Sequence, residues 1–245
     1  MGHAHVPGDG ALTGHTRGIR SAAFSPDGRT LATAGSDRST RLWDVRSHRT
    51  IATLAGETDG VDSVAFSPDG HTLATGNYDA TVRLWDLRSR EVVTTLPRTG
   101  QTCRAYALAF SPDGRTLATA SCDVVLWSTR THRRVARLTG HSETVSQLAF
   151  SPDGRVLATG GYDRTVRLWD TDSHRPVATL SGTGGYVSGL AFSPTGHSLA
   201  TVNTDRTVRL WELGPDTIAD RVCDLATVHR WQRTVTNLPL KDPCA

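Results

Sequence analysis

A unit of 42 residues, present five times, constrains the fold of this chain more than any other feature of its sequence. Five tryptophans mark the unit, each 42 residues from the next: Trp43, Trp85, Trp127, Trp169 and Trp211. A repeat of this length forms one small supersecondary unit, which buries its apolar face only against neighbouring copies. The period therefore predicts a stacked array of similar small sheets.

The local chemistry of the most complete copy predicts four short strands. Residues 145–150, 156–160, 165–169 and 177–180 are short, bounded by polar or glycine-bearing segments, and free of helical periodicity. Residues 151–154 read Ser-Pro-Asp-Gly, which fits a type I turn with Pro at the second position and Gly at the fourth. The sequence therefore predicts an antiparallel all-β chain.

Other features of this copy resemble the WD-repeat β-propeller family. They are the Gly140-His141 pair, the turn aspartate Asp163 and the Trp169-Asp170 pair, and the Ser-Pro-Asp-Gly turn is similar to that of bacterial members. The resemblance covers residues 12–213 and implies that a His, the turn Asp, a Ser or Thr and the Trp are linked by hydrogen bonds inside each blade. It assigns structural roles to His15, Asp37, Trp43, Asp79, Trp85, Asp123, Trp127, His141, Asp163, Trp169, Asp205 and Trp211.

The five copies are not equally complete, and only units one and four carry the full pattern. Unit two has Glu57 in place of the histidine, and unit five has Thr183 there, so their internal networks should differ. Unit three lacks the Gly-His pair, has Ser128 after its tryptophan, and is two residues short between Asp123 and Trp127. We expect a truncated third strand in this unit and the lowest stability of the five.

The period divides the chain into three parts. Residues 1–11 are expected to be a flexible head, residues 12–213 a propeller, and residues 214–245 a short helical tail. The repeat units are 12–53, 54–95, 96–137, 138–179 and 180–213. Five four-stranded blades are fewer than the seven usual in the resembled family. An open or incomplete ring is therefore expected, with an exposed blade face covered by the tail or by self-association with another subunit.

Composition excludes several classes of site. The net charge of +3 comes from interspersed Arg and acidic residues, so no nucleic-acid surface is expected, and no apolar segment predicts a membrane span. We expect a cytoplasmic protein without a metal or other cofactor. The cysteines form two candidate pairs, Cys103 with Cys122 and Cys223 with Cys244, and all four are expected to be free thiols.

Repetition also argues against catalysis. His15 and His141 occupy one repeat position, where a core hydrogen bond is the natural role, and no nucleophile or phosphate-binding motif is present. We interpret the chain as a non-catalytic protein-interaction scaffold with a protein partner. The alternatives are a regulatory or sensor module, or fragment, of a larger bacterial signalling protein, and a propeller enzyme.

The candidate interface consists of positions where the copies differ. In the resembled fold two such positions, the start of the first strand and the residue before the turn aspartate, open on the same rim. Tyrosine is a preferred interface anchor, and it recurs at both positions. The candidate partner-binding residues are Arg20, Ser36, Asp62, Tyr78, Tyr106, Cys122, Ser146, Tyr162, Tyr186, Ser188 and Thr204.

Overall fold

The computed structural model describes residues 11–98 and 103–213, which form five antiparallel sheets. The first strands are β1 (Ile19–Phe24), β5 (Val61–Phe66), β9 (Ala107–Phe110), β13 (Val145–Phe150) and β17 (Val187–Phe192). The second strands are β2 (Thr30–Gly35), β6 (Thr72–Asn77), β10 (Thr116–Ala120), β14 (Val156–Gly161) and β18 (Ser198–Asn203). The third strands are β3 (Thr40–Asp44), β7 (Val82–Asp86), β11 (Val124–Ser128), β15 (Val166–Asp170) and β19 (Val208–Glu212). The fourth strands are β4 (Arg49–Leu54), β8 (Glu91–Leu96), β12 (Arg134–Leu138) and β16 (Pro176–Leu180).

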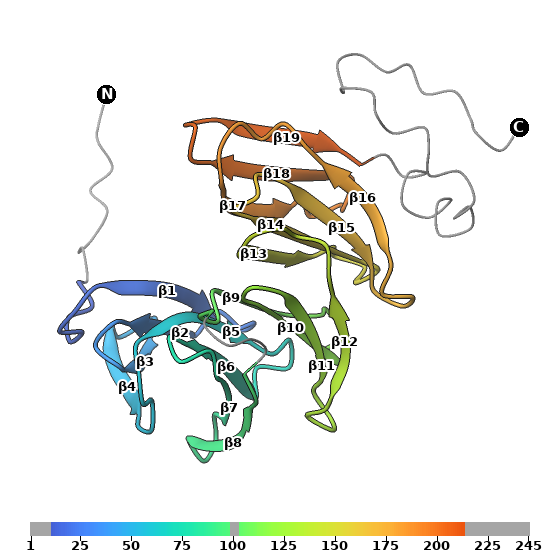
Figure 1. Ribbon diagram of the computed structural model, residues 1–245. Helices are drawn as coiled ribbons and strands as arrows, with labels where there is room; N and C mark the ends of the chain where they lie inside the picture. The colour runs from blue at the N-terminus through green and yellow to red at the C-terminus, as the bar shows by residue number, and fades with distance from the viewer. Residues whose placement is uncertain (1–10, 99–102, 214–245) are drawn as a thin grey trace, which may run out of the picture.

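Each sheet is a meander in which strands that follow each other in the chain pair with each other. We call the sheets blades 1 to 5 in chain order. The first strands contact one another in sequence, β1 with β5, β5 with β9, β9 with β13, and β13 with β17. They form the inner part of the array, while β4, β8, β12 and β16 lie at the periphery (Figure 1). The predicted all-β repeat fold is confirmed for the described residues, among which no helix could cross a membrane. The predicted helical tail lies outside them.

The Ser-Pro-Asp-Gly turns join the first and second strands as predicted. In blade 4 the Gly154 N–H donates to the Ser151 carbonyl over 2.8 Å, and Gly154 has a φ of 75°, which favours glycine. The Ser151 hydroxyl donates to Asp153 Oδ1 over 2.5 Å and accepts the Val156 N–H over 2.9 Å. The turn therefore satisfies its own polar groups, which explains its recurrence without a functional role.

Apolar side chains of neighbouring blades form the core. Between blades 3 and 4, Leu126 packs in one cluster with Leu157 and Trp169, all nearly inaccessible to solvent. The second strands carry small residues because the next blade lies close to them: a Cβ built on Gly160 would come within 2.5 Å of Val187. Blades 2 to 4 therefore bury one face against the preceding blade and the other against the following one.

Blade 3 corrects one expectation. Its third strand, β11, has five residues like the third strands of the other blades, so the predicted truncation was wrong. The two missing residues shorten β10 by one residue relative to β6 and shorten the turn that follows it, while β9 has only four residues. The chain preserves β11 because Leu126 and Trp127 supply core side chains, whereas a turn can lose a residue at little cost.

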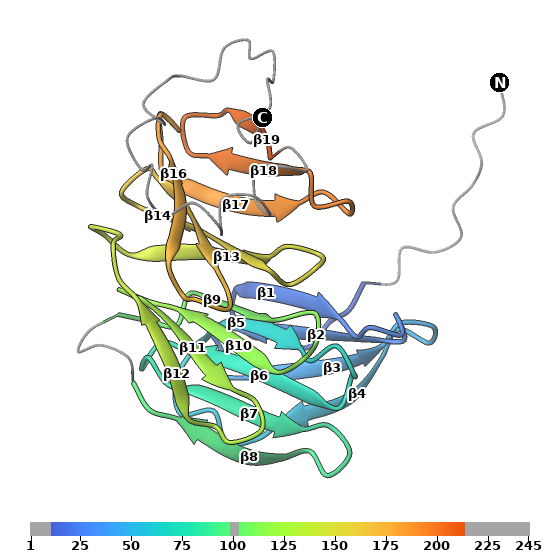
Figure 2. The ribbon, with the colours of Figure 1, turned by 90° about the vertical axis from the view of Figure 1, so that its right-hand side faces the viewer.

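Blade 5 leaves apolar surface uncovered. Its sheet has three strands, and no strand of blade 1 joins it within the described residues. Val208 and Leu210 of β19 are 66% and 72% exposed, whereas Val166 and Leu168 at the same repeat positions are 0% and 2% exposed. Ile19 at the start of β1 is likewise 52% exposed. In both views β19 lies at the outside of the array (Figure 1 and Figure 2). The described residues therefore do not close into a ring through a shared strand.

Candidate functional site

The five repeat tryptophans are each tied to the second strand of their own blade by a hydrogen bond. The acceptor is the threonine of a Leu-Ala-Thr sequence that every copy contains. From the sequence we expected a Ser or Thr in the network but did not assign it to this position. The indole N–H groups donate from Trp43 to Thr33 over 2.8 Å, Trp85 to Thr75 over 3.0 Å, Trp127 to Thr119 over 3.0 Å, Trp169 to Thr159 over 2.9 Å and Trp211 to Thr201 over 3.1 Å.

Blade 4 contains the complete network that the resemblance implies. His141 Nε2 lies 2.8 Å from Thr159 Oγ1, and His141 Nδ1 lies 2.8 Å from Asp163 Oδ2. Since the carboxylate only accepts, Nδ1 carries the proton, and burial lowers the pKa of His141 and favours the neutral ring. Nε2 then accepts from the Thr159 hydroxyl, which in turn accepts from Trp169. Both ring nitrogens are occupied within the blade.

Blade 1 repeats this network. His15 Nε2 lies 2.7 Å from Thr33 Oγ1, and His15 Nδ1 lies 3.0 Å from Asp37 Oδ2. Asp37 also accepts the Thr16 N–H over 2.8 Å and the Ser39 hydroxyl over 2.8 Å. Although burial opposes ionisation, these hydrogen bonds and that of His15 lower the pKa of Asp37 to about 2. The turn aspartates of the complete blades are therefore committed to internal contacts.

Blade 2 replaces the histidine by an ion pair. Arg83 Nη1 donates to Glu57 Oε2 over 2.9 Å, and the Glu57 side chain is fully buried. Burial raises the pKa of Glu57 in spite of this arginine. Thr58 links the pair to the turn, because its hydroxyl accepts from Arg83 and donates to Asp79 Oδ2 over 3.1 Å. The expected change of network in blade 2 is confirmed.

Blade 5 lacks the central link. Thr183 takes the histidine position, but its hydroxyl lies against two backbone carbonyls, those of Arg164 at 2.6 Å and Gly185 at 2.9 Å. Asp205 instead accepts from the hydroxyl of Thr207 over 2.6 Å. The turn and the tryptophan of this blade are therefore not joined through a histidine equivalent, as the sequence predicts.

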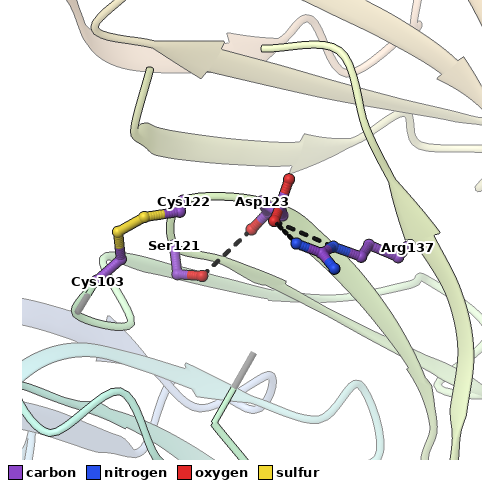
Figure 3. Close-up of a disulfide and its surroundings, with 5 residues drawn as sticks. All are labelled: Cys103, Ser121, Cys122, Asp123 and Arg137. Atoms are coloured by element: carbon purple, nitrogen blue, oxygen red, sulfur yellow. Dashed lines mark hydrogen bonds and ion pairs between the residues drawn. A yellow bond between two sulfur atoms is a disulfide. The ribbon is translucent and has the colours of Figure 1, made fainter. Parts of the chain in front are cut away.

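Blade 3 departs furthest, and it corrects the expectation of free thiols. Asp123 pairs with Arg137 of β12 rather than with a histidine, and Cys103 and Cys122 form a disulfide, with their Cα atoms 5.5 Å apart (Figure 3). The expected proximity of the two cysteines is confirmed, but the expectation of free thiols, which rested on a reducing compartment, was wrong for this pair. Cys223 and Cys244 lie outside the described residues.

Four of the candidate partner-binding residues lie at β-bulges in the first strands. Arg20, Asp62, Ser146 and Ser188 are each the second residue of their strand, where the pairing with the second strand skips a residue. A bulge leaves one residue unpaired and re-aims its side chain. Tyr106 lies just before the shorter strand β9 and has no bulge. The same β-bulge therefore re-aims the candidate side chain at the second residue of the first strand in four blades.

The residues before the turn aspartates follow the second strands directly. Their backbone N–H groups are fixed by bonds to carbonyls that precede the first strands: Ser36 to Gly18 at 2.9 Å, Tyr78 to Gly60 at 2.8 Å, Tyr162 to Thr144 at 2.9 Å and Thr204 to Tyr186 at 2.9 Å. These bonds hold the two sets of candidate residues side by side in blades 1, 2, 4 and 5.

Eight of the eleven candidate residues line one open pocket of about 420 Å³, to which all five blades contribute. We call it the rim pocket. The lining residues are Arg20, Asp62, Tyr106, Ser146, Gln147, Tyr162, Tyr186, Val187, Ser188 and Thr204. Sequence reasoning missed Gln147 and Val187, which are neighbours of predicted residues. The remaining candidates, Ser36, Tyr78 and Cys122, do not line it.

Three tyrosines form a wall of the rim pocket. The ring centroids of Tyr106 and Tyr162 are 6.4 Å apart, and those of Tyr162 and Tyr186 are 5.2 Å apart, at tilted angles. Tyr162 and Tyr186 are 38% and 43% exposed. The guanidinium carbon of Arg164 lies 5.8 Å from the centroid of the Tyr186 ring. This wall offers a rigid aromatic surface with accessible hydroxyl groups.

Tyr78 lies beside the rim pocket, and its side chain is engaged by neighbouring residues. Its hydroxyl lies 2.9 Å from Ser36 Oγ and accepts from Arg20 Nε over 3.0 Å, and Arg104 stacks 3.9 Å above its ring centroid. Tyr78 therefore organises the arginines of blades 1 and 3 beside the rim pocket. Arg104 lies in the irregular connection before β9, which has no counterpart in other copies, so the repeat comparison could not identify it.

One acidic residue lies among these arginines. Asp62 has a side chain that is 11% exposed, and its Oδ2 atom lies 3.9 Å from Arg104 Nη1. Burial raises the pKa of Asp62, although Arg104 and Arg20 act in the opposite direction. Its Oδ2 atom is buried without a hydrogen-bond donor among the described residues. No group of three or more potential metal ligands occurs in the part of the chain that the structure describes.

Comparisons with known proteins agree with the repeat analysis. The family model described as WD domain, G-beta repeat matches residues 10–44, 48–86, 90–127, 132–170 and 174–212. Each segment contains, to within one residue, the first three strands of one sheet, and each segment after the first begins with the fourth strand of the preceding sheet. The match covers most of the chain.

The relatives are similar over single repeats. They include WD repeat-containing protein SL1-17 of Schistosoma mansoni, 48% identical over 40 residues, and protein Mut11 of Chlamydomonas reinhardtii, 42% identical over 43 residues. Ribosome assembly protein 4 of Saccharomyces cerevisiae is 45% identical over 42 residues. The matches cover 16%, 18% and 17% of this chain and 13%, 12% and 8% of the relatives, respectively. All three organisms are eukaryotes, so these comparisons do not support the expected bacterial type. The five family matches and five sheets together show that the chain belongs to the WD40 repeat family.

Proposed function

We propose that this chain is a non-catalytic scaffold that binds a protein partner at the rim pocket. Proteins of the WD40 family generally act as protein-interaction scaffolds. The observation that carries the proposal is the convergence of eight sequence-variable candidate positions, from five different blades, on one pocket. Folding explains the residues on which the copies agree, whereas it does not explain why the variable ones include three neighbouring tyrosines.

The geometry of the rim pocket favours binding over catalysis. Its side chains lie on strands and short turns that are fixed by backbone hydrogen bonds, so a partner docks without much ordering of the scaffold. The histidines His15 and His141 have both ring nitrogens engaged within their blades, so neither offers a free nitrogen for acid–base chemistry. The expected cytoplasmic location stays a prediction, and the Cys103–Cys122 disulfide weighs against it, because disulfides are rare in a reducing cytoplasm.

The proposal is tested by affinity capture with quantitative mass spectrometry, using three baits. They are the unaltered chain, Tyr162→Ala in the rim pocket and Asp153→Ala in a turn that joins β13 to β14. Partners should be retained by the unaltered chain and by Asp153→Ala and depleted with Tyr162→Ala. Retention by Tyr162→Ala together with loss on Asp153→Ala would move the interface away from the rim pocket.

Tyr162 is the better anchor to remove because it is partly exposed and forms no hydrogen bond through its side chain among the described contacts. We expect Tyr162→Ala to change the free energy of unfolding by less than about 0.5 kcal/mol while weakening partner binding by about 1 to 3 kcal/mol. Tyr78→Ala is a poorer test, since it would also release Arg20 and Arg104.

A further inference from the structure

We infer that the rim pocket recognises an acidic peptide segment, in which a carboxylate lies next to an aromatic or apolar side chain. This inference rests on the proposed function and adds the chemistry of the partner. It follows from the charges exposed beside the rim pocket, from the geometry of two arginines, and from the tyrosine wall.

The turn aspartates near the rim keep their charge, but their acceptor sites are used within the blades. Asp37 and Asp163 each accept hydrogen bonds from a histidine, a backbone N–H and a hydroxyl, and Asp79 accepts from two threonine hydroxyls and an N–H. These hydrogen bonds lower the pKa values of all three aspartates against the effect of burial. Such carboxylates contribute to folding, and they offer few free acceptor sites to a partner.

The arginines beside the rim pocket have mainly neutral partners. Arg20 donates through Nε to Ser36 Oγ over 3.1 Å and to the Tyr78 hydroxyl over 3.0 Å, and its two Nη groups donate to no acceptor among the described residues. Arg104 stacks on the Tyr78 ring. Both guanidinium groups are thus held in place while donors remain available, which lowers the entropy lost when a carboxylate binds.

Asp62 offsets only part of this positive charge. It is the only acidic residue that lines the rim pocket among the described residues, and two arginines lie near it. The Asp62 side chain is mostly buried, whereas 44% of the Arg104 side chain is exposed and Arg20 is exposed. The charge that a ligand meets here is therefore mainly that of the arginines, so the complementary ligand is anionic.

The tyrosine wall indicates which kind of side chain lies next to the carboxylate of the ligand. Tyr162 and Tyr186 are partly exposed and stacked 5.2 Å apart, which suits an aromatic or apolar side chain. A pocket of about 420 Å³ holds one or two side chains rather than a folded domain, so the ligand is an extended segment. A nucleic acid fits less well, because single-stranded binding sites are long basic grooves, whereas this is a single pocket of about 420 Å³.

The test begins with selection of peptides from a random display library on the full chain, with Asp153→Ala as a second bait. The most enriched peptide is then labelled with fluorescein, and its Kd is measured by fluorescence anisotropy. We expect Asp or Glu to be enriched next to Phe, Tyr, Trp or Leu. Arg20→Gln and Tyr162→Ala should each weaken binding about tenfold, and Asp153→Ala should leave the Kd unchanged within twofold.

Three results would overturn the inference. They are enrichment of basic or purely apolar peptides, binding that is unchanged in Arg20→Gln, and tighter binding of a labelled 20-residue oligothymidine than of the selected peptide. The last result would favour a nucleic acid. Arg20 is exposed, and circular dichroism of Arg20→Gln checks that the fold is retained.

Failure of this inference can be told apart from failure of the proposed function. A captured protein partner that depends on Tyr162 but not on Arg20 would leave the rim pocket as the interface and remove the acidic ligand. A captured partner whose binding depends on neither Tyr162 nor Arg20 would contradict the proposed function itself.

Discussion

The shared threonine of blade 4 offers the sharpest test of the internal networks. Thr159 is fully buried, accepts from Trp169, and in the assignment above donates to His141. Thr159→Val keeps the shape of the side chain but leaves an indole N–H and an imidazole nitrogen without partners. A buried polar group without a partner costs about 1 to 3 kcal/mol, so we expect this variant to lose about 2 to 4 kcal/mol of unfolding free energy.

Blade 3 supplies the matched control. Thr119 accepts from Trp127 over 3.0 Å, but no histidine is present, and its other contact is a long one of 3.3 Å to the Val125 carbonyl. Thr119→Val should therefore cost about 1 to 2 kcal/mol. Urea unfolding followed by circular dichroism measures both variants, with equal m-values as a check on comparability. Equal losses in the two variants would refute the contribution assigned to His141.

Three further predictions concern other parts of the structure. Leu168→Ala should cost about 2 to 5 kcal/mol, whereas Leu210→Ala at the exposed equivalent position should cost less than about 0.5 kcal/mol; equal costs in urea unfolding would mean that β19 is covered in solution. The pKa of Asp37 is lowered from 3.8 to about 2, so its contribution to stability is complete above 3.8 and is lost as the pH falls toward 2. The free energy of unfolding should accordingly fall more steeply over that range in the unaltered chain than in Asp37→Asn, and parallel curves would contradict this. Peptide mapping without reductant should recover Cys103 linked to Cys122, and finding both as free thiols under oxidising conditions would exclude the disulfide.

The strands and their turns could be predicted because their sequence pattern recurs in five copies. The Ser151 to Gly154 turn fixes where β13 ends and β14 begins, and the recurrence of a similar turn in every copy carries that boundary to the other blades. The histidine networks of blades 1 and 4 could be predicted for a related reason, since His141 and Asp163 keep a constant separation from the tryptophan. The five copies could be compared with one another, which a single copy would not allow.

The parts that could not be predicted lie where the repeat is broken. The loss of two residues between Asp123 and Trp127 was assigned to β11, although the structure shortens β10 and the adjoining turn instead. The spacing of residues in the sequence does not show which strand or turn is shortened by a deletion. That depends on which side chains pack in the core. Arg104 and the disulfide of Cys103 also belong to this irregular region, where no other copy gives a register.

Only part of the rim pocket could be predicted from the sequence. The sequence comparison identified the variable positions, but it could not show that β-bulges direct Arg20 and Asp62 toward the tyrosines of blades 3, 4 and 5. It also treated Tyr78 as an equivalent of Tyr162. The structure separates them, because Tyr78 is engaged by two arginines while Tyr162 faces the pocket.

Hydrogen exchange measured by mass spectrometry, with and without a captured partner, tests the central claim most directly. The account predicts slower exchange in the segments that form the rim pocket, namely residues 18–22, 60–64, 144–147, 160–164 and 184–189, which include pocket-lining residues from four blades. It also predicts no change in the Ser-Pro-Asp-Gly turns or in the fourth strands. Slower exchange confined to those turns or to β4, β8, β12 and β16, with the rim segments unaffected, would contradict it.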